Sequence, residues 1–358
     1  MKLEIMKPQS NKILRTWNII VMLCTGLWSN AELHSQTTTL TMGFYNLENL
    51  FDTIDDTITD DIEFTPTGAK NWTPEKYADK LNNMARVISS LENSNGADPL
   101  VLLGVSEIEN RKVLEDLIQT AELKDKYYKI VHFDSPDLRG VDVALLYKPK
   151  YFTVLNSKSF KVPIFEKDGK PRLTRDILLV KGKIGSQNIY VFVNHWPSRR
   201  GGEEATREYR VIAAKTNKML ADSIRSVDPD AGILIMGDLN DNPDNASLIS
   251  GVSAKAKPKG LQENDFLNPF YDNYIKGEGS TAYQDAWSLF DQILISKSLL
   301  KKSGPNSLQF FNHKIFRRDF MMEKEGHFKN YPKRTFSGNQ YIGGYSDHFP
   351  VLCYFRIE

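Results

Sequence analysis

Two polar side chains follow directly on a run of apolar residues in the second half of the chain. Residues 233–236 are all apolar, Gly237 comes next, and Asp238 and Asn240 follow it. A short apolar run bounded by turn residues is typical of a buried strand, and a glycine lets the backbone turn without a Cβ clash. Side chains two positions apart in an extended chain point the same way, so Asp238 and Asn240 can act together at the end of the strand. Taken alone, the pattern also fits an ordinary turn.

Polar side chains end other predicted strands in the same way. Strands are expected at 38–45, 100–105, 189–193, 290–295 and 351–357. The polar residues at or beside their ends are Asn46, Glu48, Glu107, His195, Asp291, Asp347 and His348. Carboxylates and carboxamides of this kind suit Mg²⁺ or Mn²⁺ rather than Zn²⁺, and a metal ion beside histidines fits attack on phosphorus. Taken singly, Glu107 could instead face the dipole of the helix after it, and His195 could lie in a polar turn.

The composition is that of an ordinary globular protein. Of the 358 residues, 41% are hydrophobic and 25% are charged, and 46 Lys and Arg stand against 45 Asp and Glu, so no gross charge indicates a polyanionic partner. Two cysteines are too few for a disulfide framework. Strands outnumber helices, and helices are expected from Pro74, with Thr73 as its cap, and over 203–224. This pattern favours a one-domain α/β sandwich.

The first 31 residues have the pattern of an export signal. Basic residues precede the apolar segment 17–24, and residues 29–31 offer a small-x-small cleavage site. The apolar segment is shorter than the roughly 20 residues that span a bilayer, which disfavours a membrane anchor, and a lipoprotein modified at Cys24 is a weaker alternative. Cleavage after Ala31 would remove four basic residues and one acidic residue and leave a mature chain, 32–358, with a net charge of about −2. We expect that chain to be periplasmic or secreted and to have no transmembrane segment.

Taken together and in order, the motifs resemble the endonuclease/exonuclease/phosphatase superfamily, the DNase I-like metal-dependent phosphohydrolases. The motifs are Asn46-x-Glu48, Ser106-Glu107, Asn194-His195, Gly237-Asp238-Leu239-Asn240, Asp291-Gln292-Ile293 and Ser346-Asp347-His348. The resemblance spans roughly residues 40–358. It implies a single domain, 32–358, with the fold of a four-layer α/β/β/α sandwich, a site at one mouth of that sandwich, and a monomer.

The resemblance also implies how a metal ion and water are held. Glu107 would be the principal Mg²⁺ ligand, with Mn²⁺ as an alternative ion. Glu48 and Asp347 would ligate the ion directly or through water, and Glu48 occupies a position at which some members carry a shorter carboxylate or none. Asp238 would position or deprotonate the attacking water.

The remaining roles implied by the resemblance concern the phosphate. Asn46 and Asn240 would orient the scissile phosphate, and His195 would assist the leaving group. His348 would bind a phosphoryl oxygen, oriented by Asp291. The residue types support this pairing independently, because a carboxylate partner raises the pKa of an imidazole and fixes its tautomer.

The substrate stays open at this stage. A nuclease acting on DNA or RNA gains affinity from arginines set against phosphates, and Arg139 and Arg199 or Arg200 are the candidates. The alternative is the same chemistry on sphingomyelin-type lipid head groups or inositol phosphates. A lipid enzyme would expose an aromatic hairpin, which only residues 259–283 could supply. A non-catalytic binding protein is disfavoured because every expected catalytic position is filled. The acidic loop 52–71 is expected to be solvated, because a calcium loop needs closer ligand spacing and a turn glycine.

Overall fold

The computed structural model describes residues 38–92, 99–166, 168–301, 304 and 306–357. The predicted export signal, residues 1–31, lies outside these ranges. The described residues all belong to the unit Thr37–Glu358. Within them, no helix combines the length and the apolar character that crossing a membrane requires.

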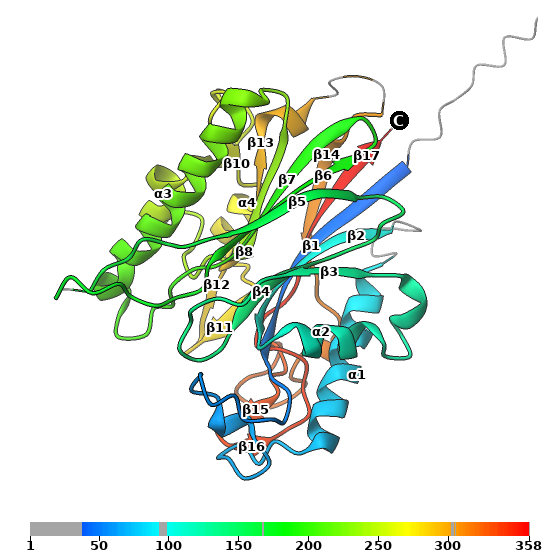
Figure 1. Ribbon diagram of the computed structural model, residues 1–358, viewed down its shortest axis with the longest axis vertical. Helices are drawn as coiled ribbons and strands as arrows, with labels where there is room; N and C mark the ends of the chain where they lie inside the picture. Colours follow the sequence, from blue (N-terminus) through cyan, green and yellow to red (C-terminus); the bar gives the residue numbers. More distant parts are fainter. Residues whose placement is uncertain (1–37, 93–98, 167, 302–303, 305, 358) are drawn as a thin grey trace, which may run out of the picture. The chain divides into compact units, whose positions relative to one another are not determined.

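Two large sheets form the centre of the fold (Figure 1). The first sheet has the strand order β14 (Gln309–Ile315), β17 (Val351–Ile357), β1 (Thr38–Leu50), β2 (Leu100–Ile108), β4 (Asp142–Tyr147) and β3 (Lys129–His132). The second has the order β5 (Thr153–Phe160), β6 (Ile177–Ile184), β7 (Gln187–His195), β8 (Gly232–Asp238), β13 (Asp291–Ser296), β10 (Phe266–Leu267) and β9 (Ala254–Lys255). The smaller elements are the hairpins β11 (Thr281–Tyr283)–β12 (Ala286–Ser288) and β15 (Phe336–Ser337)–β16 (Gln340–Tyr341), with helices α1 (Pro74–Leu91), α2 (Arg111–Ile118), α3 (Glu203–Val227) and α4 (Tyr271–Ile275).

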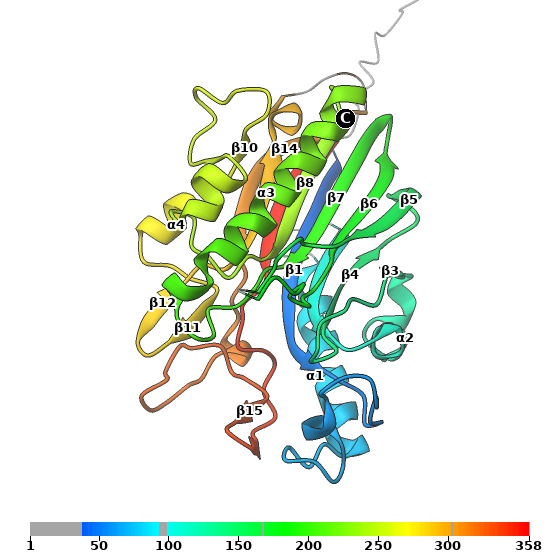
Figure 2. The ribbon, with the colours of Figure 1, turned by 60° about the vertical axis from the view of Figure 1, so that its left-hand side comes forward.

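The alternation of side chains along the central strands assigns the layers. In β7, Val191 and Val193 belong to the core between the sheets, whereas Tyr190 and Phe192 pack in the cluster that holds the alanines of α3. Helices α1 and α2 pack their apolar faces with the first sheet. The layers are therefore α1 and α2, the first sheet, the second sheet and α3, as Figures 1 and 2 show. The predicted four-layer α/β/β/α sandwich is confirmed.

The helix signals in the sequence are largely confirmed. Helix α1 begins at Pro74, and the Thr73 side chain accepts a hydrogen bond from Lys76 N at 3.5 Å, as its predicted cap role requires. Helix α3 runs to Val227 rather than ending at Ile224. Strands β5 and β14 were not predicted. Both lie at sheet edges and are mostly half-buried or exposed, so their sequences carry little of the apolar signal that marks a central strand.

Candidate active site

Three neighbouring strands of the second sheet place three of the predicted site residues in one row. His195 of β7 is paired with Asp238 of β8, and Asp238 is paired with Asp291 of β13. All three residues are buried. The sequence suggested that Gly237 ends the strand. In the structure, Gly237 lies within β8, which continues to Asp238. A Cβ at this position would lie 2.4 Å from Asn194 O, so glycine is required here for the close approach of β7 and not for a turn.

The first sheet supplies carboxylates from strained backbone. Glu48 and Glu107 have φ angles of 49° and 55°, in the left-handed region that residues other than glycine rarely adopt. The pairing of β1 with β2 shifts register between Asn46 and Leu50, where Glu48 lies. Glu107 Oε2 accepts a hydrogen bond from Asn49 N at 3.1 Å, which fixes the direction of this side chain. Strained backbone persists only where the surrounding contacts hold it, and it is found most often at functional sites.

The two sheets meet at Asp238. Asn46 Nδ2 donates to Asp238 Oδ2 at 3.1 Å, and Asn240 N donates to Asp238 Oδ1 at 3.0 Å. Burial raises the pKa of Asp238 to about 7, with the charges of Asp291 and Glu107 acting in the same direction against that of His348. Near neutral pH the protonated and the ionised form of this carboxyl group are therefore both populated.

The residues around Glu107 fit a divalent cation. Ligand atoms of Glu107, His195 and Asp238 all lie within 4.8 Å of one another. His195 Nε2 is 3.7 Å from Glu107 Oε1 and 3.6 Å from Asp238 Oδ2. A cation beside Glu107 would offset the mutual repulsion of the carboxylates, and their oxygens are the ligands that Mg²⁺ and Mn²⁺ prefer. Glu107 belongs both to this cluster and to the ligand set that the sequence resemblance implied.

His348 and Asp291 form the expected pair. Asp291 Oδ2 lies 2.6 Å from His348 Nδ1, which leaves Nε2 of the ring 3.9 Å from Asp238 Oδ2. Burial disfavours the charged imidazole, but the carboxylates of Asp291 and Asp238 raise the pKa of His348 well above its ordinary value. Ser346 positions this histidine, because its hydroxyl donates to Asn46 O at 2.7 Å and accepts from His348 N at 3.1 Å. The sequence placed Ser346 in a motif but gave it no role.

His195 is electrostatically different from His348. Burial, together with the positive charges of Arg175 and Arg139, lowers the pKa of His195 well below its ordinary value. Its Nδ1 is buried and has no hydrogen-bond partner among the described residues. Arg175 holds this strand end by donating to His195 O at 3.1 Å and to Trp196 O at 2.6 Å. Arg175 lies just before β6, and no motif in the sequence marked it as part of the site.

Glu48 lies among protein donors. Its Oε2 accepts from Thr335 N at 2.7 Å and from Thr335 Oγ1 at 2.8 Å, and Lys80 Nζ is 3.9 Å away. Burial and the charge of Asp347 raise the pKa of Glu48 to about 7. Lys80 is fully buried on α1, a position that the helical pattern did not mark as functional. Arg334 links Glu48 to Asp347, and no sequence motif contained it.

Of the three arginines that were candidates for phosphate binding, Arg200 is exposed, and Arg139 and Arg199 have different surroundings. Arg139 is about half exposed and pairs with Asp137 at 3.5 Å. Asp137 also accepts from Arg175, which holds the strand end at His195, so Arg139 lies beside the site. The guanidinium group of Arg199 is engaged by hydrogen-bond acceptors of the protein itself. It donates to Asn240 O at 2.9 Å and to Asp241 Oδ1 at 3.1 Å, and it pairs with Glu203. The structure therefore corrects the role of Arg199, which holds the Asn240 segment in place and does not present a free guanidinium to phosphate.

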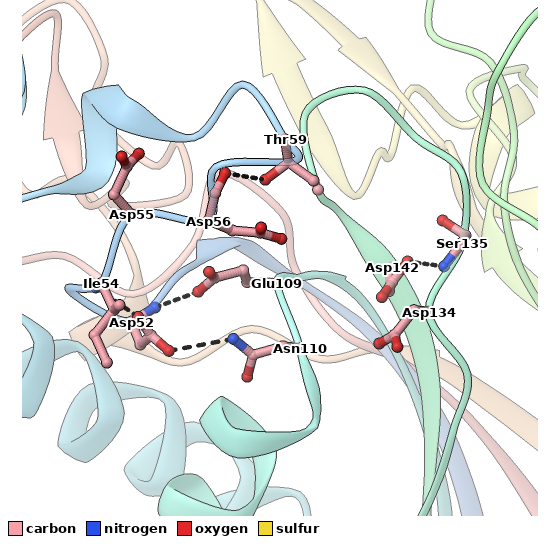
Figure 3. Close-up of a pocket in the computed structure, with 11 residues that line it drawn as sticks. Asp52, Ile54, Asp55, Asp56, Thr59, Glu109, Asn110, Asp134, Ser135 and Asp142 are labelled. Carbon is pink, nitrogen blue, oxygen red and sulfur yellow. Dashed lines mark hydrogen bonds between the residues drawn. The ribbon is translucent and has the colours of Figure 1, made fainter.

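Most of the acidic loop is exposed, as its sequence suggested. Part of it lines a cavity of about 320 Å³ together with residues from β4 and the segments after β2 and β3 (Figure 3). Glu109 reaches the loop and accepts from Asp52 N at 2.6 Å. Ligand atoms of His132, Asp134 and Asp142 also converge here within 4.8 Å. Among the described residues, the lining of this cavity contains carboxylates and no lysine or arginine.

The aromatic side chains of the stretch 259–283 are mostly buried or half-buried, and Tyr271 and Tyr274 belong to the half-buried ones. Phe266 and Phe270 are fully buried, and Tyr283, at the tip of the β11–β12 hairpin, is exposed. The stretch therefore does not present the broad apolar surface that an enzyme of lipid head groups would use to enter a membrane interface.

The comparison with known families defines the class. Residues 41–357 match the Endonuclease/Exonuclease/phosphatase family, and the chain therefore belongs to this family, whose members are phosphoric ester hydrolases. None of the curated proteins compared with the chain matches it.

Solved structures share the fold at low sequence identity. A humanized TDP2 of D. rerio is 15% identical, with a TM-score of 0.53, covering 88% of this chain and 98% of that one. A family protein of Bacteroides thetaiotaomicron is 14% identical, with a TM-score of 0.52, covering 90% of this chain and 96% of that one. The human Nocturnin catalytic domain is 12% identical, with a TM-score of 0.50, covering 88% of this chain and 94% of that one. These similarities bear on the fold alone.

Proposed function

We propose that the protein is a divalent-metal-dependent phosphodiester hydrolase that acts on nucleic acid as an endonuclease. The main support is the meeting of Glu107, Asp238 and the His348–Asp291 pair at one edge of both sheets. Mg²⁺, or Mn²⁺ in its place, would be held chiefly by Glu107 and would supply charge neutralisation to the phosphate and its leaving oxygen.

The other side chains divide the remaining chemistry. Asp238 orients and deprotonates the attacking water, and a pKa of about 7 suits a general base at neutral pH. Asn46 and Asn240 fix this carboxylate from opposite sides. His348, kept protonated by Asp291, donates from Nε2 to a phosphoryl oxygen and stabilises the charge that develops there. His195, which is neutral, assists the leaving group.

Two observations favour nucleic acid over lipid. A D. rerio TDP2 with this fold, at 15% identity and a TM-score of 0.52, is described as complexed with single strand DNA product. In this chain, Arg139 lies half-exposed beside the site, where it can contact a neighbouring phosphate. The burial of Phe266 and Phe270 weakens one alternative, hydrolysis of sphingomyelin-type head groups, while hydrolysis of inositol phosphates stays as the other alternative.

A parallel substrate panel tests the proposal. The purified protein with Mg²⁺ is offered supercoiled plasmid, single-stranded RNA, sphingomyelin vesicles and an inositol phosphate, each with and without EDTA. The proposal expects EDTA-sensitive nicking of plasmid or cleavage of RNA. Release of phosphocholine or phosphate, with both nucleic acids intact, would replace it with the lipid or inositol alternative. Silence on every substrate would refute it.

We also propose that the chain is exported, cleaved after Ala31 and monomeric. The basic and apolar pattern of residues 1–31 supports export. N-terminal sequencing of the protein recovered outside the cytoplasm should begin at Glu32, and a sequence beginning at Met1 would contradict cleavage. Light scattering of the mature protein should give the mass of one chain, and the mass of a dimer would contradict the monomer.

A further inference from the structure

A guanidinium group lies where two of the predicted metal-ligating carboxylates face each other. Arg334 Nη2 is 2.5 Å from Asp347 Oδ2, and Arg334 Nε is 3.6 Å from Glu48 Oε1. The arginine side chain is half exposed, whereas Glu48 is buried and Asp347 is mostly covered. One guanidinium therefore pairs with both carboxylates at the mouth of the site.

The protein also uses the other oxygens of these carboxylates. Glu48 Oε2 accepts both hydrogen bonds from Thr335, and Asp347 Oδ1 faces His348 Nε2 at 3.9 Å. A direct metal ligand must offer a lone pair to the ion at a short distance. Each carboxylate oxygen of Glu48 faces a donor of the protein, Oε1 that of Arg334 and Oε2 those of Thr335. Glu48 is therefore better placed to position Arg334 than to ligate a metal ion.

The backbone holds Arg334 in this position. A Cβ on Gly344 would lie 2.0 Å from Arg334 O, so the two segments run in close contact that only glycine permits. Tyr345 N donates to Lys333 O at 2.6 Å. Buried Lys80 then ties the two segments to α1, because its Nζ donates to Thr335 Oγ1 and to Tyr345 O, each at 2.6 Å. An ion pair on mobile side chains contributes little, but this arginine has a fixed backbone and two shielded partners.

Enzymes that place two metal ions about 3.5–4 Å apart hold the second ion with a further group of carboxylates. In this protein, Glu48 and Asp347 are the carboxylates available for that purpose beside Glu107. Among the described residues, ligand atoms at the site converge at Glu107, His195 and Asp238, and not at Glu48 and Asp347.

We propose that Arg334 fills the position of a second cation between Glu48 and Asp347, so that the site takes one divalent ion, at Glu107. This inference rests on the proposed function as a metal-dependent hydrolase. It makes Arg334 a positioning residue and assigns Glu48 and Asp347 to that arginine in place of the metal ion.

The test counts bound Mn²⁺ without using turnover. Calorimetry and the electron paramagnetic resonance signal of free Mn²⁺ give the number of ions bound by the full chain. All counts are made in an Asp134→Asn background, which removes a carboxylate from the separate cluster of His132, Asp134 and Asp142. In that background the otherwise wild-type protein should bind one. Arg334→Met, which keeps the length of the side chain and removes its charge, should bind two, because the freed carboxylates attract a second ion. Arg334→Lys should stay at one. Arg207→Met is the matched control, since Arg207 is 49% exposed against 50% for Arg334 and pairs with Glu204 on the surface of α3.

A second variant keeps the inference testable if Arg334→Met does not fold, as judged by circular dichroism. Glu48→Gln in the same Asp134→Asn background should leave both the number of ions and the affinity for the ion unchanged. Two ions in the otherwise wild-type protein, one ion in folded Arg334→Met, or a loss of an ion in Glu48→Gln would each overturn the inference. An inactive protein that binds one ion would refute the proposed function alone, and an active protein that binds two would refute this inference alone.

Discussion

Replacing Asp291 with asparagine tests the catalytic role of the His348–Asp291 pair. The change keeps the size of the side chain and removes its charge from a pair that is fully buried on the aspartate side and joined at 2.6 Å. Breaking a buried pair by removing one partner costs about 3–5 kcal/mol. If that stabilisation is expressed in the transition state, at 1.36 kcal/mol per tenfold change in rate, Asp291→Asn should lower kcat/KM by about 10²- to 10⁴-fold.

The assay compares kcat/KM for Asp291→Asn, His348→Ala and the double variant on the substrate that the panel identifies. Because the two residues act as a unit, the double variant should be no slower than His348→Ala alone. Asp228→Asn is the control, since Asp228 lies near the opposite end of β7, where it accepts from Asn188 Nδ2 at 2.7 Å, and this change should leave kcat/KM unaltered. Near-normal turnover of Asp291→Asn, or losses that multiply in the double variant, would refute the pairing.

Three further predictions follow from other parts of the structure. Glu107→Gln should weaken Mn²⁺ binding and abolish EDTA-sensitive turnover while the fold stays intact, and calorimetry that finds unchanged Mn²⁺ affinity would remove Glu107 as the principal ligand. Gly237→Ala should lower the free energy of unfolding by about 1–3 kcal/mol, because the added Cβ meets Asn194 O at 2.4 Å, and an unchanged denaturant midpoint would show that β7 and β8 separate easily. Glu92→Gln should lower the free energy of unfolding at neutral pH. Burial opposes ionisation of Glu92, but hydrogen bonds from Lys126 and Lys148 lower the pKa of this carboxyl group. The wild type's advantage should be complete above the ordinary glutamate pKa and should vanish as the pH falls through the lowered folded-state pKa; melting curves that differ equally at every pH would contradict this ion-pair origin.

The sequence predicted the fold and the site where local pattern determines position. Asp238 and Asn240 follow an apolar run that forms a central, fully buried strand, and such a strand leaves few choices for where its end lies. His195 and Asp291 end or begin the neighbouring strands, so pairing in the sheet brings them to Asp238. The motif order then identified the family, which the match over residues 41–357 confirms.

The parts that the sequence did not predict depend on contacts between distant segments. Lys80 lies on an amphipathic helix and Arg334 lies in a loop, and only the folded chain brings both to Glu48. Arg199 looked like a phosphate ligand because it follows a histidine at a strand end. Its acceptors, Asn240 and Asp241, come from a strand end that folding brings beside it, and they determine its role. Polar groups of this kind carry no local periodicity, so their partners follow from tertiary structure alone.

Plasmid nicking by the wild type and by His348→Ala, run side by side in Mg²⁺ and in EDTA, tests the central claim most directly. Metal-dependent hydrolysis at this site predicts nicking by the wild type in Mg²⁺ and none in EDTA. It also predicts a rate for His348→Ala lower by several orders of magnitude, with an unchanged circular dichroism spectrum. Nicking that survives EDTA, or a His348→Ala protein as fast as the wild type, would contradict the account.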